Sequence, residues 1–152
     1  MAAFIGSYQH ALDEKNRLMI PRRMREQVDE QREGVGFYIT RGLETCLALY
    51  TPTVWQELEQ GILNVSREEF RNEDARKFRR QFYGNAEYVT MDRQGRILLA
   101  ERLKTLAGIE RDVVLVGVGN HIEVWDHQRW ERFMNESADQ YEQFASRALP
   151  GL

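Results

Sequence analysis

The pattern of hydrophobic and polar positions begins with two short apolar runs on either side of a polar turn. Residues 8–12 and 17–20 predict two strands, joined by a turn over residues 13–16. Asp13 can open this turn by accepting hydrogen bonds from the backbone that follows it, and Asn16 tolerates a left-handed conformation. The first unit predicted is therefore strand, turn, strand.

This unit occurs twice. Residues 13–20 return as residues 92–99, and both copies read Asp-x-x-x-Arg followed by three apolar residues, at an offset of 79 residues. Gly95 takes the place of Asn16 in the second copy, and both residue types accept a left-handed backbone. Two copies in a chain this short predict one pseudo-symmetric domain.

Each copy continues with the same elements. A short helix is expected over residues 22–28, after Pro21, and its counterpart over residues 101–107 is closed by Gly108. A hairpin follows in each copy, with strands predicted at residues 36–40 and 46–50, and at residues 113–116 and 122–125. These later elements match at an offset of 75 residues. The slip of four is expected in the polar stretch after the first motif, where an insertion costs little.

A helix bearing a tryptophan is predicted after each hairpin. Thr51 and Asp126 are the expected N-caps of these helices. An extra helix between the copies is expected to start at the capping box Ser66-Arg67-Glu68-Glu69 and to end near Gly84. The helical spacing of Trp55, Trp130 and the phenylalanines favours packing over base stacking. The helix after Asp126 is expected to carry Trp130, Phe133, Met134 and Tyr141.

The fold class predicted is α+β. The first repeat is expected over residues 7–54 and the second over residues 86–129, and together they should make one globular domain. A helical linker over residues 55–85 and a C-terminal helix over residues 130–148 complete the chain.

Charge is distributed unevenly along the chain. The net charge is −3, yet residues 15–25 contain five basic residues and no acid, which indicates a locally positive surface. The chain has no apolar run long enough for a membrane span, and its single cysteine, Cys46, fits a reducing compartment. No secretory leader is expected, because residues 1–15 lack a basic segment followed by an apolar one. A cytoplasmic protein is predicted, with Cys46 as a buried structural thiol.

The doubled motif resembles a known family. The first copy, Asp13-x-x-x-Arg17-x-x-Ile20-Pro21-x-x-Met24-Arg25, is similar to the signature of AbrB-like swapped-hairpin DNA-binding domains. The second copy fits the same template with Ala100 in place of the usual proline and Lys104 in place of the usual arginine, and Asn16 replaces the usual glycine in the first. Two such units, each followed by a Trp-bearing helix, resemble the MraZ proteins of bacteria.

The resemblance implies more than the spacing does. It implies a pseudo-symmetric swapped-hairpin β-barrel and a ring-shaped homo-oligomer. It also implies a nucleoid-associated transcriptional regulator of the division and cell-wall gene cluster, which binds direct repeats in promoter double-stranded DNA. No cofactor or metal is expected.

The candidate DNA contacts are the basic residues of the two motifs. The planar fork of Arg17 suits phosphate oxygens or the guanine edge, but an alternative is that Arg17 pairs with Asp13 and stiffens the loop. The arginines of the first short helix either contact DNA or are simply exposed to solvent. The predicted contacts are Lys15, Arg17, Arg22, Arg23, Arg25, Arg93 and Arg96, and the turn residues are Asp13, Asn16, Asp92 and Gly95. Acids at Asp92 and Glu101 make the second copy less positive, so the first is preferred.

Two other functions compete with DNA binding. A hydrolase would need Asp13 or Asp92 beside a histidine such as His10, within bonding reach in a concave pocket. The sequence has no nucleophile motif, phosphate loop or metal-ligand cluster to support it. A protein-binding module, as in antitoxins that share this fold, usually carries a long disordered tail, whereas the last third of this chain has a helical pattern.

Overall fold

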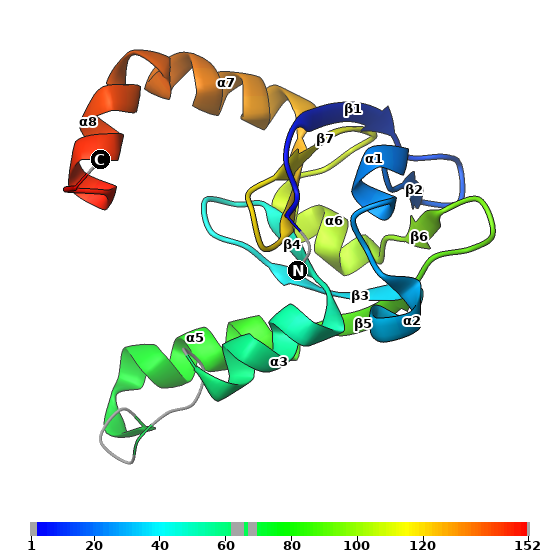
Figure 1. Ribbon diagram of the computed structural model, residues 1–152, viewed down its shortest axis with the longest axis horizontal. Coiled ribbons are helices and arrows are strands. Elements are labelled where there is room, and N and C mark those ends of the chain that lie inside the picture. The colour runs from blue at the N-terminus through cyan, green and yellow to red at the C-terminus, as the bar shows by residue number, and fades with distance from the viewer. Residues whose placement is uncertain (1–2, 62–65, 67–69, 152) are drawn as a thin grey trace.

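The computed structural model describes residues 3–61, 66 and 70–151 (Figure 1). Its strands are β1 (Ser7–Ala11), β2 (Arg17–Met19), β3 (Gly36–Arg41), β4 (Leu47–Tyr50), β5 (Glu87–Thr90), β6 (Arg96–Leu98), β7 (Asp112–Gly117) and β8 (Ile122–Asp126). Its helices are α1 (Arg22–Arg25), α2 (Glu30–Glu33), α3 (Pro52–Gln60), α5 (Glu73–Gly84), α6 (Glu101–Ala107), α7 (His127–Ser137), the 3₁₀ turn η1 (Ala138–Gln140) and α8 (Tyr141–Ala148). The α+β class is thereby confirmed.

The two repeats are interleaved in the sheet. Six antiparallel strands follow the order β1-β7-β8-β4-β3-β5, and β2 pairs with β6 in a separate ribbon. The first strand of each repeat thus pairs with the hairpin of the other repeat, as β1 does with β7 and β5 with β3. When each strand is replaced by its counterpart in the other repeat, the same strand order is obtained, read from the opposite edge of the sheet. The sheet therefore has a pseudo-two-fold axis between β4 and β8.

The hydrogen bonding does not close a barrel. The six-stranded sheet ends in two edge strands, β1 and β5, and the β2–β6 ribbon is a second sheet. The structure therefore differs from the predicted swapped-hairpin β-barrel in that its sheet is open. The reason lies in the first strand-turn-strand unit of each repeat, because its two strands contribute to different sheets rather than continuing one sheet around the core.

The core lies between the six-stranded sheet, the ribbon and helices α1 and α6. The ribbon contributes Leu18 and Ile97, which are opposite each other in register, and α1 and α6 contribute Met24 and Leu103. All four side chains are almost wholly buried. Cys46 is also buried, as expected, in a smaller cluster with Trp125. Burial, with the acid Glu123 nearby, raises the pKa of its thiol.

Several helix ends lie where the sequence predicts them. The Thr51 side chain accepts a hydrogen bond from the Val54 amide, and Asp126 does the same for the Arg129 amide. Gly108 ends α6 with a φ of 64°. These caps fix where the two Trp-bearing helices leave the sheet.

The extra helix and the last helix differ from the prediction. The Asn72 side chain caps a new helix, α5, so the helix expected to run from the Ser66 capping box is interrupted there. Residues 67–69 of that box lie outside the described residues. The last helix is broken by η1 between α7 and α8. An additional short helix, α2, was not predicted, and its N-cap is Asp29.

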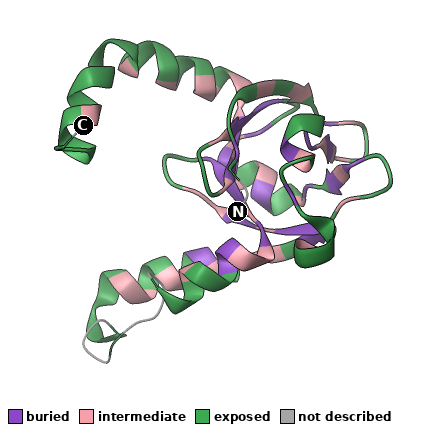
Figure 2. Ribbon diagram, viewed as in Figure 1, coloured by how far each residue is buried: buried purple, intermediate pink, exposed green. Residues whose placement is uncertain are grey.

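Two helical arms extend from the sheet. The first arm is α3 and α5, which pack together through stacked Trp55 and Phe82 rings with centroids 5.4 Å apart. The second, the C-terminal arm, is α7, η1 and α8. Both arms extend to the left in Figure 1, and the C-terminal arm is mostly exposed (Figure 2). The preference for packing over base stacking is confirmed for Trp55, which is buried.

The four-residue slip between the repeats occurs in two places. Phe37 and Ile39 face the core as Val113 and Leu115 do, which sets an offset of 76 residues for β3 and β7. Three residues are therefore inserted before β3, where α2 forms, and one in the loop between β3 and β4. The prediction that all four fall directly after the motif is corrected accordingly.

Candidate nucleic-acid interface

The first motif folds into a turn organised by Asp13. One oxygen of its carboxylate accepts hydrogen bonds from the amides of Lys15 and Arg17, both at 2.9 Å. The other oxygen accepts from Arg17 Nε at 2.6 Å. Asn16, with a φ of 59°, provides the left-handed residue. The aspartate-arginine pair weighed as the alternative role for these residues is thus present in the structure.

The second motif repeats this geometry. Asp92 accepts from the amides of Gln94 and Arg96 at 2.9 and 3.0 Å and from Arg96 Nε at 2.8 Å. Gly95 has a φ of 81°. In each turn the backbone amide of the motif arginine is the main cause that lowers the pKa of the aspartate. Both aspartates therefore remain ionised well into the acidic range.

The ribbon brings the two motifs onto one outward face. Arg17 lies opposite Leu98, and Arg96 lies opposite Met19, while the alternate residues point into the core. Leu98 is 60% exposed. We call this surface, made of Asp13, Arg17, Met19, Asp92, Arg96 and Leu98, the motif face. Arg96 Nη1 also lies 3.6 Å from the Asp13 carboxylate, so the two motifs share one ion-pair network.

Each motif turn is bonded to the backbone of the other repeat. The Ile20 amide donates to the Gly95 carbonyl at 2.9 Å, and the Leu99 amide donates to the Asn16 carbonyl at 2.8 Å. These reciprocal bonds extend the ribbon at both ends. They place the turns at opposite ends of the motif face, because β2 and β6 are antiparallel.

The helices brace the turns with different side chains. Arg25 donates from Nε to the Ile20 carbonyl at 2.9 Å and lies against Gly95, where a Cβ atom would be only 2.6 Å from the arginine. In the other half, Lys104 donates to the Asn16 side chain at 2.9 Å, and Asn16 donates to Glu101 at 2.7 Å. Sequence reasoning missed these braces, since only the fold brings Arg25 and Gly95, or Asn16 and Lys104, into contact across the two repeats.

The predicted basic residues divide into two groups. Arg17, Arg25 and Arg96 are half-buried and held by hydrogen bonds. The others lie exposed around the motif turns and on α1, and they are Lys15, Arg22, Arg23 and Arg93. Arg22 pairs with Glu26 at 3.1 Å, but its side chain is 84% exposed. Arg25 differs from Arg22 because its side chain turns inward and braces the second motif.

The two halves differ in how many cations remain available. Arg102, the counterpart of Arg23, donates to Glu87 at 3.3 Å and to the Asn85 carbonyl at 3.4 Å. Lys104, the counterpart of Arg25, is engaged with Asn16 and Glu101. The first half therefore presents more exposed positive charge than the second.

Catalytic chemistry has little geometric support. Both carboxylate oxygens of Asp13 are occupied by Arg17 and backbone amides, and the hollow beside Asp13 is lined by Glu14, Glu110 and Arg111 rather than by His10. Burial lowers the pKa of His10. Among the described residues, no group of three or more potential metal ligands comes together. Likewise, none of the described helices is long and apolar enough to cross a membrane.

The comparison with known proteins matches this architecture. The model of a family described as MraZ protein, antitoxin-like, matches twice, over residues 3–81 and 82–150. The chain belongs to the MraZ family. A protein named transcriptional regulator MraZ from Moorella thermoacetica is 42% identical over 96% of both chains. Proteins of the same name from Heliobacterium modesticaldum and Clostridium botulinum are 38% and 40% identical, over 96% and 95% of both chains.

The two MraZ repeats of this chain differ in one further place. In the first, Glu33 of α2 accepts from the Thr53 amide at 3.0 Å and from its hydroxyl at 2.7 Å, at the start of α3. No helix separates α6 from β7 in the described second repeat, and a hollow of about 260 Å³ lies beside the start of α7.

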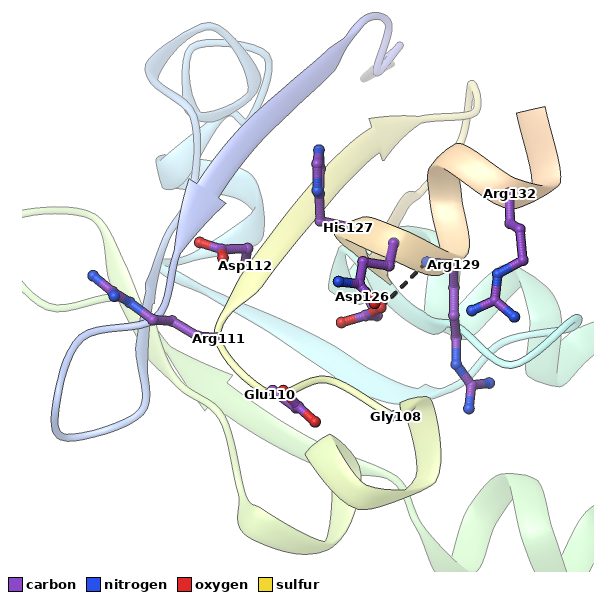
Figure 3. Close-up of a pocket in the computed structure, with 9 residues that line it drawn as sticks. Gly108, Glu110, Arg111, Asp112, Asp126, His127, Arg129 and Arg132 are labelled. Atoms are coloured by element: carbon purple, nitrogen blue, oxygen red, sulfur yellow. Dashed lines mark hydrogen bonds between the residues drawn. The ribbon is translucent and has the colours of Figure 1, made fainter. Parts of the chain in front are cut away.

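Figure 3 shows Arg129 and Arg132 side by side on α7 and Arg111 across this hollow. The dashed line marks the Asp126 cap of α7. Glu110, Asp112 and Asp126 line the same hollow as the three arginines. Because these charges balance, the hollow gives no excess of positive charge for a nucleic-acid phosphate, and the motif face remains the candidate interface of this MraZ chain.

Proposed function

We propose that this chain is a sequence-specific DNA-binding transcriptional regulator of the bacterial division and cell-wall gene cluster, which acts in the cytoplasm on the nucleoid. The observation that carries the proposal is the pair of Asp-x-x-x-Arg turns with the same aspartate-arginine geometry on one outward face. Exposed cations lie on both motif turns, at Lys15 and Arg93, and on the helix that follows the first motif, at Arg22 and Arg23. The relatives named as transcriptional regulators support the same class of function.

The roles of the residues follow from their contacts. Asp13 and Asp92 orient Arg17 and Arg96, whose second guanidinium nitrogens can still reach a phosphate or a guanine edge. Lys15, Arg22, Arg23 and Arg93 are exposed and contact phosphates, which supply affinity and register rather than sequence. Arg25 supports the second turn and acts indirectly. Asn16 and Gly95 set the loop conformation.

The proposed operator is a set of direct repeats in the promoter, and the proposed protein is a ring of identical subunits. One motif face is small, so a single subunit would bind weakly. A ring presents many copies of the face, and neighbouring subunits can engage successive repeats, which raises affinity through effective concentration. The antitoxin-like alternative, a protein-binding module, would use these arginines on acidic protein rather than on phosphates.

The test is DNA binding by the full chain to fragments of its own upstream region. Affinity should rise steeply from one repeat to four, fail when the spacing changes by half a helical turn, and fall with salt at a slope near −0.9 per phosphate contacted. Arg17→Ala should weaken binding by about 1–3 kcal/mol per site if it reads a base. If a folded Arg17→Ala ring binds DNA with wild-type affinity, the DNA interface lies elsewhere on the protein. Equal affinity for one repeat and four would end the avidity mechanism.

A further inference from the structure

The C-terminal arm carries an apolar stripe that the chain covers only at its start. Trp130 and Phe133 pack against Trp125, with ring centroids 5.5 and 5.1 Å apart. The stripe continues beyond this contact with residues that are 43%, 74% and 44% exposed, namely Met134, Tyr141 and Phe144. Large apolar side chains exposed at helical spacing indicate an interaction surface.

An apolar hollow lies at the base of the other arm. It has a volume of about 320 Å³, and its walls include Leu58 of α3 and Phe78 and Phe82 of α5. Tyr50 of β4 and Leu43 of the β3–β4 loop line the opposite side. Leu43 is 72% exposed and Phe78 is 45% exposed, so the apolar lining opens to solvent.

The two surfaces carry opposite charge. From Arg76 to Gly84, α5 has four cations and no acid. From Glu131 to Glu142, the C-terminal arm has four acids and one cation. The rim of the hollow is mixed, with Arg41 and His121 beside Glu44 and Glu123, so the complementarity resides in α5. Complementary charge of this kind selects and orients a partner.

We infer that the C-terminal arm of one copy docks against the α3–α5 arm of a second copy, with Tyr141 and Phe144 entering the apolar hollow. This inference rests on the proposed ring and assigns its junction. Every copy has one arm to donate and one hollow to accept it, so the interface is heterologous, and head-to-tail contacts of this type close into rings. The acidic side of the donated arm then lies along basic α5.

The assignment predicts how defective copies combine. Phe144→Asp removes the donated surface, and Leu43→Asp removes the accepting one. Both side chains are exposed in the single chain, so each variant should fold normally. The control is Ile5→Asp, which alters a side chain that is 75% exposed, against 72% for Leu43, and that lies outside both arms and outside the lining of the hollow.

Sedimentation analysis of the full-length chains, without DNA, tests the junction. Each interface variant should sediment as a monomer, and the control should keep the wild-type size. An equimolar mixture of Phe144→Asp and Leu43→Asp chains should form dimers and nothing larger, because one intact junction remains between the intact arm of one chain and the intact hollow of the other.

The outcomes separate this inference from the proposed function. Rings of normal size in both variants would overturn the junction while leaving the ring intact. A mixture that stays monomeric would overturn the head-to-tail arrangement. A monomeric wild-type chain would overturn both the junction and the ring, and DNA binding by the motif face would then be judged from the operator experiment alone.

Discussion

The two motif turns have the same aspartate-arginine geometry but different surroundings. The first turn contains Asn16, whose side chain bonds to Lys104 and Glu101, and its helix leaves Arg23 exposed. The second turn contains Gly95, which makes room for Arg25, and its helix engages Arg102 with Glu87. Duplicated units can therefore keep one scaffold and diverge in charge. Here each copy braces the turn of the other, while the first copy presents most of the exposed cations.

The scaffold should respond equally when either half of the ribbon is altered. Leu18→Ala and Ile97→Ala each remove a fully buried side chain, and each should lower the free energy of unfolding by about 2–5 kcal/mol. The two residues are in register, so the loss of unfolding free energy in the double variant should differ measurably from the sum of the two single losses. Urea unfolding at one protein concentration measures this. A cost several-fold larger on one side would show that the halves do not share one core.

DNA affinity should instead separate the halves. Arg23→Ala should reduce operator affinity and lower the salt slope by about one unit, as expected for a lost phosphate contact. Arg102→Ala, its counterpart, should leave both nearly unchanged, because Arg102 is engaged with Glu87 and the Asn85 carbonyl. Titration of labelled operator at several salt concentrations provides the comparison. Equal losses from both substitutions would mean that the two helices face DNA alike.

Exchanging the left-handed residues should reveal the different braces. Gly95→Asn places a side chain against Arg25 and should cost about 1–3 kcal/mol, the usual range for overpacking. Asn16→Gly removes two side-chain hydrogen bonds at a half-buried position but also removes the cost of a left-handed Asn, so its net effect should be below about 1 kcal/mol. Thermal unfolding of both variants measures which substitution destabilises the protein more. The reverse order would place the more constrained turn in the first repeat.

The smallest effect expected is on acid stability. Each aspartate has a lowered pKa in the folded chain, so its stabilisation is complete above the ordinary aspartate pKa and is lost as the pH falls through the lowered value. Asp13→Asn should destabilise at neutral pH slightly more than Asp92→Asn, since Asp13 also faces Arg96. Both differences from wild type should shrink below about pH 3–4. Urea midpoints measured from pH 7 to pH 2 test this, and a difference that grows on acidification would contradict it.

Local signals in the sequence predicted much of this fold. Thr51 and Asp126 capped the helices expected of them, Gly108 ended α6, and the doubled Asp-x-x-x-Arg spacing predicted two equal turns. These features depend on residues within a few positions of one another. Asn72 is a helix start that local sequence signals do not single out, because the Ser66 capping box nearby matches the expected pattern better.

Long-range features could not be predicted in the same way. The exchange of β1 and β5 between repeats follows from which strand edges meet, which periodicity does not encode. The braces from Arg25 and Lys104 join residues from different repeats. For the candidate site, the positions of the motif residues were predictable, but their division into held and exposed cations depends on these distant neighbours.

The interleaving has a consequence for how the chain folds during synthesis. Tyr8 of β1 pairs with Leu115 of β7, and the ribbon needs both β2 and β6, so the first half cannot complete either sheet by itself. Contacts between distant parts of a chain slow folding. At roughly 5–20 residues per second of translation, the first repeat waits several seconds on the ribosome with unpaired strand edges. The protein therefore folds largely after its synthesis is finished, and its first half is the segment most in need of protection by chaperones.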